Sequence, residues 1–176
     1  MTITDKHVLF FNGTLSNWYK CRINVDSELL KTELGLEPHI DGVLCFYYSE
    51  HLFMYVKALV FNDTENAKKI YESKTPREAK SYGRAVSGFD ESVWREKRVD
   101  AMRFAIERKY DECEDFRDVL HNKMLQGLVF AECNPRDTIW GIGLDEDDPR
   151  ADNESEWRGL NLLGSLLTEI RNEKSM

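Results

Sequence analysis

The stretch ESVWREKRVDAMRFAIERK, residues 91–109, decides the fold class of this chain. Within it and just after it, Val99, Met102, Ile106 and Tyr110 recur at the spacing of one face of an α-helix. In a globular protein such a face is buried against other elements. The stretch therefore predicts a long amphipathic helix, against which we expect the other elements to pack.

Helical patterns also occur on both sides of this stretch. The further predicted helices cover residues 49–61, 63–73, 76–82, 114–120 and 159–172. Ser49 is expected to act as an N-cap, Pro76 suits a first helical turn, and Gly83 suits the end of a helix. The expected buried stripe of the last helix consists of Leu160, Leu163, Leu167 and Ile170.

The first third of the chain has strand patterns instead. Apolar or alternating runs cover Val8–Asn12, Cys21–Val25 and Val43–Tyr48, and turn signals such as Asn12-Gly13 interrupt them. We expect these runs to form a small antiparallel sheet. The predicted fold is therefore α+β, compact and helix-rich. No repeat or low-complexity tract marks a boundary, so we expect one domain over residues 1–176.

The composition is that of a globular protein with a polar surface. Of the 176 residues, 41% are hydrophobic and 32% are charged. The longest apolar runs are strand-sized, and Met1–Lys6 lacks the features of a signal peptide. The four cysteines lie far apart, so we expect reduced thiols in a cytoplasmic protein with no membrane partner. No closely spaced Cys or His ligands occur, so we expect no metal and no cofactor.

The acidic charge of the chain is concentrated in one segment. The formal net charge is −8. Seven acids between Asp145 and Glu156, opposed by Arg150 alone, give that segment −6. We predict that residues 144–157 form a mobile, solvent-facing loop, since seven acids cannot all be buried. The sequence shows no basic stripe of the kind that general nucleic-acid binders carry.

Glu50 and Lys57 are candidates for chemistry because they interrupt a predicted helix that is otherwise apolar. They lie two helical turns apart and share one face, with Phe53 and Met54 between them. Charged groups on an apolar face cost free energy unless they pair or act. The alternative is a solvated face with two unrelated surface charges, and spacing alone favours it.

Other polar and aromatic residues also allow two interpretations. Trp94 suits a core position, or stacking on a planar ring. Asp137 and Trp140 flank a turn, which Asp137 could simply cap. Asn161 could cap the last helix, and His51 is expected to be a structural histidine.

Six blocks of the sequence, taken in order, resemble the signature of the NADAR (YbiA-like) family. The blocks are Leu15-Ser16-Asn17-Trp18-Tyr19; Ser49-Glu50-His51 with Lys57; residues 76–84; Trp94 with Met102-Arg103; residues 135–143; and Asn161-Leu162-Leu163-Gly164. Each block is weak alone, but the six in this order are specific. The chain departs from the pattern at Lys20 and at Met54-Tyr55-Val56, positions that we expect to shape the substrate pocket.

The resemblance implies an N-glycosidase that acts on phosphoribosylamino-pyrimidine intermediates of riboflavin synthesis. It also allows an ADP-ribosyl hydrolase that removes ADP-ribose from guanine bases. The essential glutamate, the aromatic residue and the late acid of the family correspond to Glu50, Trp94 and Asp137. We expect catalytic roles for Glu50, Lys57 and Asp137, in which Lys57 would orient Glu50, hold it ionised or contact a phosphate. From the matched blocks and their chemistry, the expected substrate-binding residues are Asn17, Trp18, Lys80, Gly83, Arg84, Trp94, Trp140, Gly141 and Asn161. Among them, Arg84 and Lys80 are candidates for phosphate contact, and Trp94 and Trp140 could enclose the base or the ribose.

Cleavage of a ribose–nitrogen bond builds positive charge on the sugar, and a buried carboxylate can stabilise that charge and activate water. We expect Glu50 to play this part and to converge with Lys57, Trp94, Asp137 and Trp140 on one cleft. The expected partners are a small ribosyl or ADP-ribosyl substrate and, in the second interpretation, ADP-ribosylated nucleic acid. A third interpretation is a non-catalytic module that only binds ADP-ribose or NAD.

Overall fold

The computed structural model describes residues 1–175, which form seven α-helices, five β-strands and two short 3₁₀ turns. The α+β class is thus confirmed. The chain divides into two compact units. Unit 1 comprises Met1–Tyr19 and the chain from Glu114 onward, and unit 2 comprises Lys20–Cys113. The expectation of one domain over the whole chain stays a prediction.

Unit 2 begins with a two-stranded antiparallel sheet. Strand β3 (Ile23–Asp26) pairs with β4 (Val43–Phe46), and Val25 lies opposite Leu44. This pairing confirms the predicted antiparallel sheet for these two strands. Between them lies helix α1 (Ser27–Leu34), which the sequence analysis missed. Its signals were local, because Asp26 caps its first turn and Gly35 ends it with a φ of 67°.

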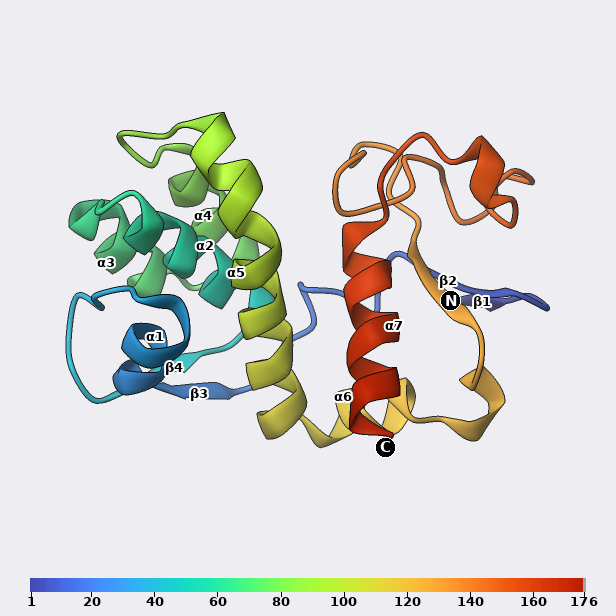
Figure 1. Ribbon diagram of the computed structural model, residues 1–176, viewed down its shortest axis with the longest axis horizontal. Coiled ribbons are helices and arrows are strands. Elements are labelled where there is room, and N and C mark those ends of the chain that lie inside the picture. The colour runs from blue at the N-terminus through green and yellow to red at the C-terminus, as the bar shows by residue number, and fades with distance from the viewer. Residues whose placement is uncertain (176) are drawn as a thin grey trace. The chain divides into compact units, whose positions relative to one another are not determined.

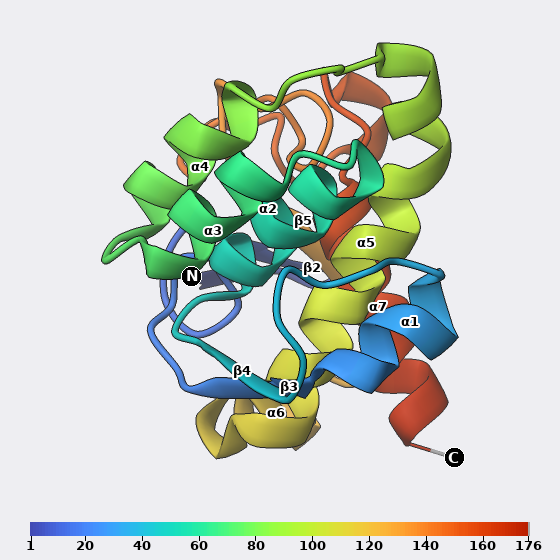
Figure 2. The same cartoon turned by 90° about the vertical axis from the view of Figure 1, so that its left-hand side faces the viewer.

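Four helices complete unit 2: α2 (Ser49–Val60), α3 (Thr64–Glu72), α4 (Pro76–Arg84) and α5 (Glu91–Glu112). Helix α2 packs against the other three (Figures 1 and 2). Ten of its twelve residues are buried, as expected for a helix that is apolar on nearly all sides. Helix α2 is therefore the centre of this unit.

Two residues that we expected at helix ends have other positions, and several predicted ends are shifted by one to three residues. Ser49 is the first residue of α2 rather than its N-cap, because Tyr48 has the extended backbone of the cap position. Gly83 lies inside α4, which continues to Arg84. The predicted starts at Pro76 and Glu91 are confirmed.

Unit 1 contains a three-stranded sheet in the order β1 (Thr2–Ile3), β2 (His7–Phe10) and β5 (Val129–Glu132). Strands β2 and β5 are parallel, so β2 does not join the antiparallel sheet that we expected. Strand β5 was not predicted from the sequence. Parallel neighbours need a long crossover, and here the crossover contains the whole of unit 2.

Two helices accompany this sheet: α6 (Glu114–Leu120), with its predicted bounds, and α7 (Leu162–Lys174). Helix α7 packs along β5 (Figure 1). Its buried stripe includes Leu163, Leu167 and Ile170 as expected. Leu160 precedes the helix and is 61% exposed, so its predicted place in the stripe was wrong.

The acidic segment 144–157 is anchored to unit 1. Leu144 and Ala151 are buried in a core cluster with Leu9 of β2, and Trp157 packs on that cluster. The acids Asp145, Asp147, Asp152, Glu154 and Glu156 are exposed, while Glu146 and Asp148 are half-buried. The expected solvent-facing acids are thus largely confirmed. The expectation that the whole segment faces solvent was wrong, because apolar residues alternate with the acids and pack inward.

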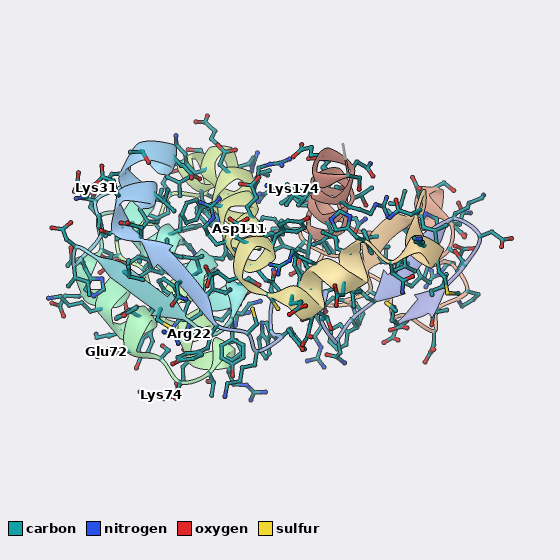
Figure 3. The ribbon with its side chains drawn as sticks, turned by 90° about the horizontal axis from the view of Figure 1, so that it is seen from below. Arg22, Lys31, Glu72, Lys74, Asp111 and Lys174 are labelled. Carbon is teal, nitrogen blue, oxygen red and sulfur yellow. The ribbon has the colours of Figure 1, made fainter. Side chains whose placement is uncertain are left out.

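Charged side chains cover much of the remaining surface. Figure 3 labels several of them, including Lys31, Glu72 and Lys74 at the outer edge of unit 2. Within residues 1–175, no helix has both the length and the apolar character that crossing a membrane requires.

Candidate active site

The first turn of α2 holds the carboxylate of Glu50. The first N–H groups of a helix carry partial positive charge, so a carboxylate in this turn is stabilised electrostatically. Glu50 is only 5% exposed, which rules out the alternative of a solvated surface charge. Burying a carboxylate costs free energy unless other groups compensate for the lost water.

Lys80 supplies a compensating charge from helix α4. Its Nζ atom lies 3.6 Å from Oε1 of Glu50. The start of α4 is fixed by a reciprocal cap, in which Thr75 accepts a bond from the N–H of Glu78 and the Glu78 side chain accepts one from the N–H of Thr75. Lys80, which we expected to contact phosphate, is therefore an ion-pair partner of Glu50.

Gly83 allows α4 to approach α2 closely near this pair. A β-carbon on Gly83 would lie 3.0 Å from Cγ of Met54 and would overlap its sulfur. Met54 follows Glu50 by one helical turn, and Lys80 precedes Gly83 by one turn. The glycine therefore contributes by its small size, which keeps Lys80 within reach of Glu50.

Lys57 lies two turns after Glu50 with its ammonium group over aromatic rings. The Nζ atom is 4.4 Å from the ring centroid of Phe89 and 5.6 Å from that of Trp94. A cation over a ring face is attracted by the negative charge of that face. Phe89, in the connection from α4 to α5, was missed by the sequence analysis, because a single aromatic residue in a loop has no periodicity.

The electrostatic surroundings of Lys57 include charges from three helices. Burial lowers the pKa of Lys57, the charge of Glu91 raises it, that of Arg84 lowers it, and that of Glu50 raises it. Arg84 is exposed at the end of α4. Two cations expected to contact substrate, Lys57 and Arg84, thus lie near enough to act on one another.

Trp94 occupies a core position. It is 7% exposed, and its ring centroid lies 5.4 Å from that of Phe53 and 6.4 Å from that of Phe61. Phe53 follows Glu50 by three residues on α2, so the aromatic cluster and the carboxylate share one helix face. The core interpretation of Trp94 is confirmed, and its stacking on substrate stays a prediction.

His51 is a structural histidine, as expected. It is buried, its Nε2 atom contacts the carbonyl oxygen of Ile70, and burial lowers its pKa. The ring lies edge-on to Phe46. A neutral histidine packed in this way serves the fold of unit 2.

In unit 1, Asp137 caps a turn. Its Oδ1 atom accepts hydrogen bonds from the N–H groups of Ile139 at 3.0 Å and Trp140 at 2.8 Å. The turn leads into Gly141, where a β-carbon would lie 2.8 Å from the carbonyl oxygen of Glu132. The capping interpretation of Asp137 is confirmed, and glycine is required at position 141 by the close approach of β5.

Asn161 joins the end of this turn region to β5. Its Oδ1 atom accepts from the N–H of Glu132 at 3.0 Å, and its Nδ2 donates to the carbonyl of Phe130 at 2.9 Å. Asn161 stands at the N-cap position of α7 with a φ of 51°, but its side chain makes no cap bond to that helix. Asn161 is thus the capping residue of α7 by position, as the sequence allowed, while its side-chain amide bonds to β5 and not to the helix.

The remaining predicted residues of unit 1 differ in exposure. Asn17 is buried, whereas Trp18 is 43% exposed and donates its backbone N–H to Oγ of Ser16 at 3.2 Å. Unit 1 also has a hollow of about 590 Å³ beside Asn134 and Arg136. None of the predicted site residues lines this hollow.

The predicted residues fall into two groups, one in each unit. Unit 2 contains Glu50, Lys57, Lys80, Gly83, Arg84 and Trp94, and unit 1 contains Asn17, Trp18, Asp137, Trp140, Gly141 and Asn161. Contacts link the members of the first group along α2, α4 and α5. The expected convergence of Asp137 and Trp140 with Glu50 stays a prediction. In the described part of the chain, no three His, Cys, Asp or Glu side chains gather in a way that could hold a metal ion.

Comparison with known proteins agrees with the sequence blocks. The chain is 39% identical to protein irg-1 of Caenorhabditis elegans, over 97% of this chain and 80% of that protein. It is 30% identical to N-glycosidase R617 of Acanthamoeba polyphaga mimivirus, over 97% of both chains. It is also 32% identical to the chloroplastic riboflavin biosynthesis protein PYRR of Zea mays, over 72% of this chain and 19% of the maize protein. The model of the NADAR domain matches residues 9–173, and the chain therefore belongs to the NADAR family.

Proposed function

We propose that this protein is an N-glycosidase, a hydrolase that cleaves the bond between ribose C1 and a nitrogen of a phosphorylated ribosylamino-pyrimidine. The observation that carries the proposal is the buried carboxylate of Glu50, held 3.6 Å from Lys80 in the first turn of α2. The names of two relatives, an N-glycosidase and a riboflavin biosynthesis protein, support the reaction and the substrate class.

The reaction needs a negative group beside the sugar. As the C1–N bond breaks, its electron pair goes to nitrogen and positive charge develops on the ribose ring. The carboxylate of Glu50 stabilises this charge, and it accepts a proton from the water whose oxygen bonds to C1. That proton then passes to the departing nitrogen, so the products are ribose phosphate and an amino-pyrimidine.

The neighbouring cations suit a phosphorylated substrate. Arg84 is exposed at the end of α4 and acts electrostatically on Lys57. A guanidinium group binds phosphate through two parallel hydrogen bonds. We assign phosphate contact to Arg84 and Lys57, while Lys80 orients Glu50 through their ion pair. The ring of Trp94 is the candidate for contact with the pyrimidine.

The test is an assay of the purified protein on two substrates, a phosphoribosylamino-pyrimidine and a DNA oligonucleotide carrying ADP-ribose on guanine. Mass spectrometry would follow the released ribose phosphate or ADP-ribose. We expect turnover of the pyrimidine. Binding of ADP-ribose without cleavage of either substrate would overturn the proposal and would identify a non-catalytic binding module.

A second candidate function is removal of ADP-ribose from guanine in nucleic acid. The observation in its favour is a basic face on α4, where the side chains of Arg77 and Arg84 are exposed and that of Lys80 is half-buried between them. Residues at this spacing share one helix face, and such a face can contact successive phosphates. Faster cleavage of the oligonucleotide than of the pyrimidine, with strong inhibition by salt, would establish this second function.

We also propose a cytoplasmic location. All four cysteines are free thiols, which supports a reducing compartment. Fractionation of cells that express the tagged protein would test this location.

A further inference from the structure

The two ends of unit 2 lie close together in space, and two cysteines and a lysine from these ends are neighbours. Cys21 is the second residue of the unit and Cys113 is its last. The N–H of Cys21 donates to the carbonyl of Tyr47 at 3.0 Å, next to the end of β4. The N–H of Cys113 donates to the carbonyl of Lys109 at 2.9 Å, in the last turn of α5.

The two thiols are in direct contact, since the side chains of Cys21 and Cys113 share a hydrogen bond. Cys113 is 6% exposed, whereas Cys21 is half-buried and so the more accessible of the two thiols. Sulfur atoms at hydrogen-bonding distance need only a small approach to reach the length of a disulfide bond, about 2 Å. The other cysteines are placed differently: Cys45 lies within β4, and Cys133 is buried after β5 and faces the carbonyl of Ala131.

We propose that Cys21 and Cys113 form an oxidative modification site, at which a peroxide converts the thiol pair into a disulfide. The more accessible thiol, Cys21, attacks the peroxide oxygen, so Cys21 becomes a sulfenic acid and one water leaves. The sulfur of Cys113 then attacks the sulfur of Cys21, and a second water leaves as the S–S bond forms. In total, two thiols are oxidised by one hydrogen peroxide, which is reduced to two waters.

Lys109 gives this pair a charge environment that an ordinary thiol lacks. Its side chain is 1% exposed, and both thiols act on it electrostatically. Burial and the neighbouring Cys113 raise the pKa of Cys21 to about 12, and the charge of Lys109 offsets part of that rise. The ammonium group therefore favours the thiolate that must form during attack, in surroundings that otherwise disfavour it.

The disulfide would connect residues 21 and 113 and so close unit 2 into a covalent loop. A cross-link over a long loop restricts the unfolded chain and stabilises the folded one. The loop contains Glu50, Lys57 and Lys80. We expect the oxidised protein to melt several degrees above the reduced protein, whether or not it has the proposed enzymatic activity.

The experiment treats the full-length reduced protein with hydrogen peroxide and then blocks the remaining thiols with an alkylating reagent. Digestion without reductant and mass spectrometry should yield a cross-linked peptide containing Cys21 and Cys113, lighter by two hydrogens than its reduced parts. Cys45→Ser is the matched control and should form the same cross-link. Cys113→Ser should form none and should accumulate sulfenic acid at Cys21.

Circular dichroism would show that each variant is folded, and Cys21→Ala gives a second variant if Cys113→Ser does not fold. Alkylation of both Cys21 and Cys113 after peroxide treatment would overturn the proposal. A cross-link that contains Cys45 or Cys133 instead would also overturn it. Because the readout is mass and not turnover, failure here is distinct from failure of the proposed function.

Discussion

Glu50 is almost completely removed from water, which costs its carboxylate the free energy of hydration. The partial positive charge at the start of α2 compensates for part of that cost. Lys80 provides another part at 3.6 Å. Removing one partner of a buried ion pair leaves the other charge uncompensated, which is costly. A glutamine at position 50 preserves the size of the side chain while removing its charge. That change therefore separates the chemical role of the carboxylate from its role in packing.

We predict that Glu50→Gln folds and loses nearly all hydrolysis, because no negative charge then faces the developing cation. General acid–base help alone contributes on the order of a hundredfold to ten-thousandfold in rate. Turnover would be measured on the phosphoribosylamino-pyrimidine. The control is Glu65→Gln, which changes an exposed carboxylate in the first turn of α3. Near wild-type turnover in folded Glu50→Gln would remove the central residue from the mechanism.

Substitutions at Asp137 can separate its role in capping the turn from any role of its negative charge. Its Oδ1 atom accepts two backbone hydrogen bonds, and an asparagine can supply the same acceptor without the charge. We predict that Asp137→Ala lowers the free energy of unfolding by about 1 kcal/mol, as for loss of a capping side chain. Asp137→Asn should lower it by less. Urea titration of both variants would check this order, and equal losses would show that the charge holds the turn.

At the scale of elements, the contact between α2 and α4 depends on a glycine. A β-carbon at Gly83 would have no room, because the side chain of Met54 occupies that space. We predict that Gly83→Ala lowers the free energy of unfolding by roughly 1–3 kcal/mol, as overpacking of a buried contact does. It should also reduce turnover by moving Lys80 away from Glu50.

The matched test of that contact is the double variant Gly83→Ala with Met54→Ala, in which the smaller side chain makes room for the new methyl group. The loss of stability in the double variant should be smaller than the sum of the two single losses. If the losses in unfolding free energy simply add in urea titrations, the new β-carbon at position 83 does not clash with Met54.

A second interaction between elements joins β2 to the acidic segment. The ring nitrogens of His7 lie 2.8 Å from Oδ1 of Asp152 and 3.0 Å from Oε1 of Glu154. The histidine is buried, whereas the carboxylates are exposed. We predict that His7→Gln speeds amide hydrogen exchange in residues 150–157, since a glutamine cannot hold both acids. The exposed Lys123 of the same unit, changed to Gln, is the control. Unchanged exchange would show that Leu144 and Ala151 alone hold the segment.

At the scale of the whole molecule, buried titratable groups determine how stability depends on alkaline pH. Burial lowers the pKa of Lys109 from 10.5 to about 8. Between these values the unfolded chain holds a proton that the folded chain has lost, so stability rises with pH. Burial raises the pKa of Cys21 and Cys133 from 9.0 to about 12. Above pH 9 the folded chain therefore retains protons that the unfolded chain loses, and stability falls.

These opposite effects predict that the free energy of unfolding is highest near pH 9. Above that pH, the stability lost through the two thiols exceeds the stability gained through the single lysine. Urea titrations from pH 7 to pH 10.5 would locate it. Cys133→Ala should make the fall above pH 9 shallower, and Lys109→Met should remove the rise between pH 8 and pH 9. A fall that begins at pH 8 would contradict this account of Lys109.

Much of the helical structure could be read from the sequence because helix signals are local. The apolar repeat after Glu91 and the proline at position 76 each lie within the helix that they predict, and both starts are confirmed. Helix α1 had equally local signals at Asp26 and Gly35, and it was missed because its apolar pattern is short. The family could also be recognised from the sequence, since its signature consists of short blocks of residues in a fixed order along the chain.

The tertiary structure alone decided that β2 pairs with β5 and which charged side chains meet. Strand β5 joins β2 across more than a hundred residues, and no local pattern encodes such a pairing. The ion pair of Glu50 with Lys80 comes from the packing of two helices, whereas Asn161, expected as a helix cap, bonds to a distant strand. Sequence patterns record what each residue does to its near neighbours. Contacts between elements arise only when buried surfaces are matched in three dimensions.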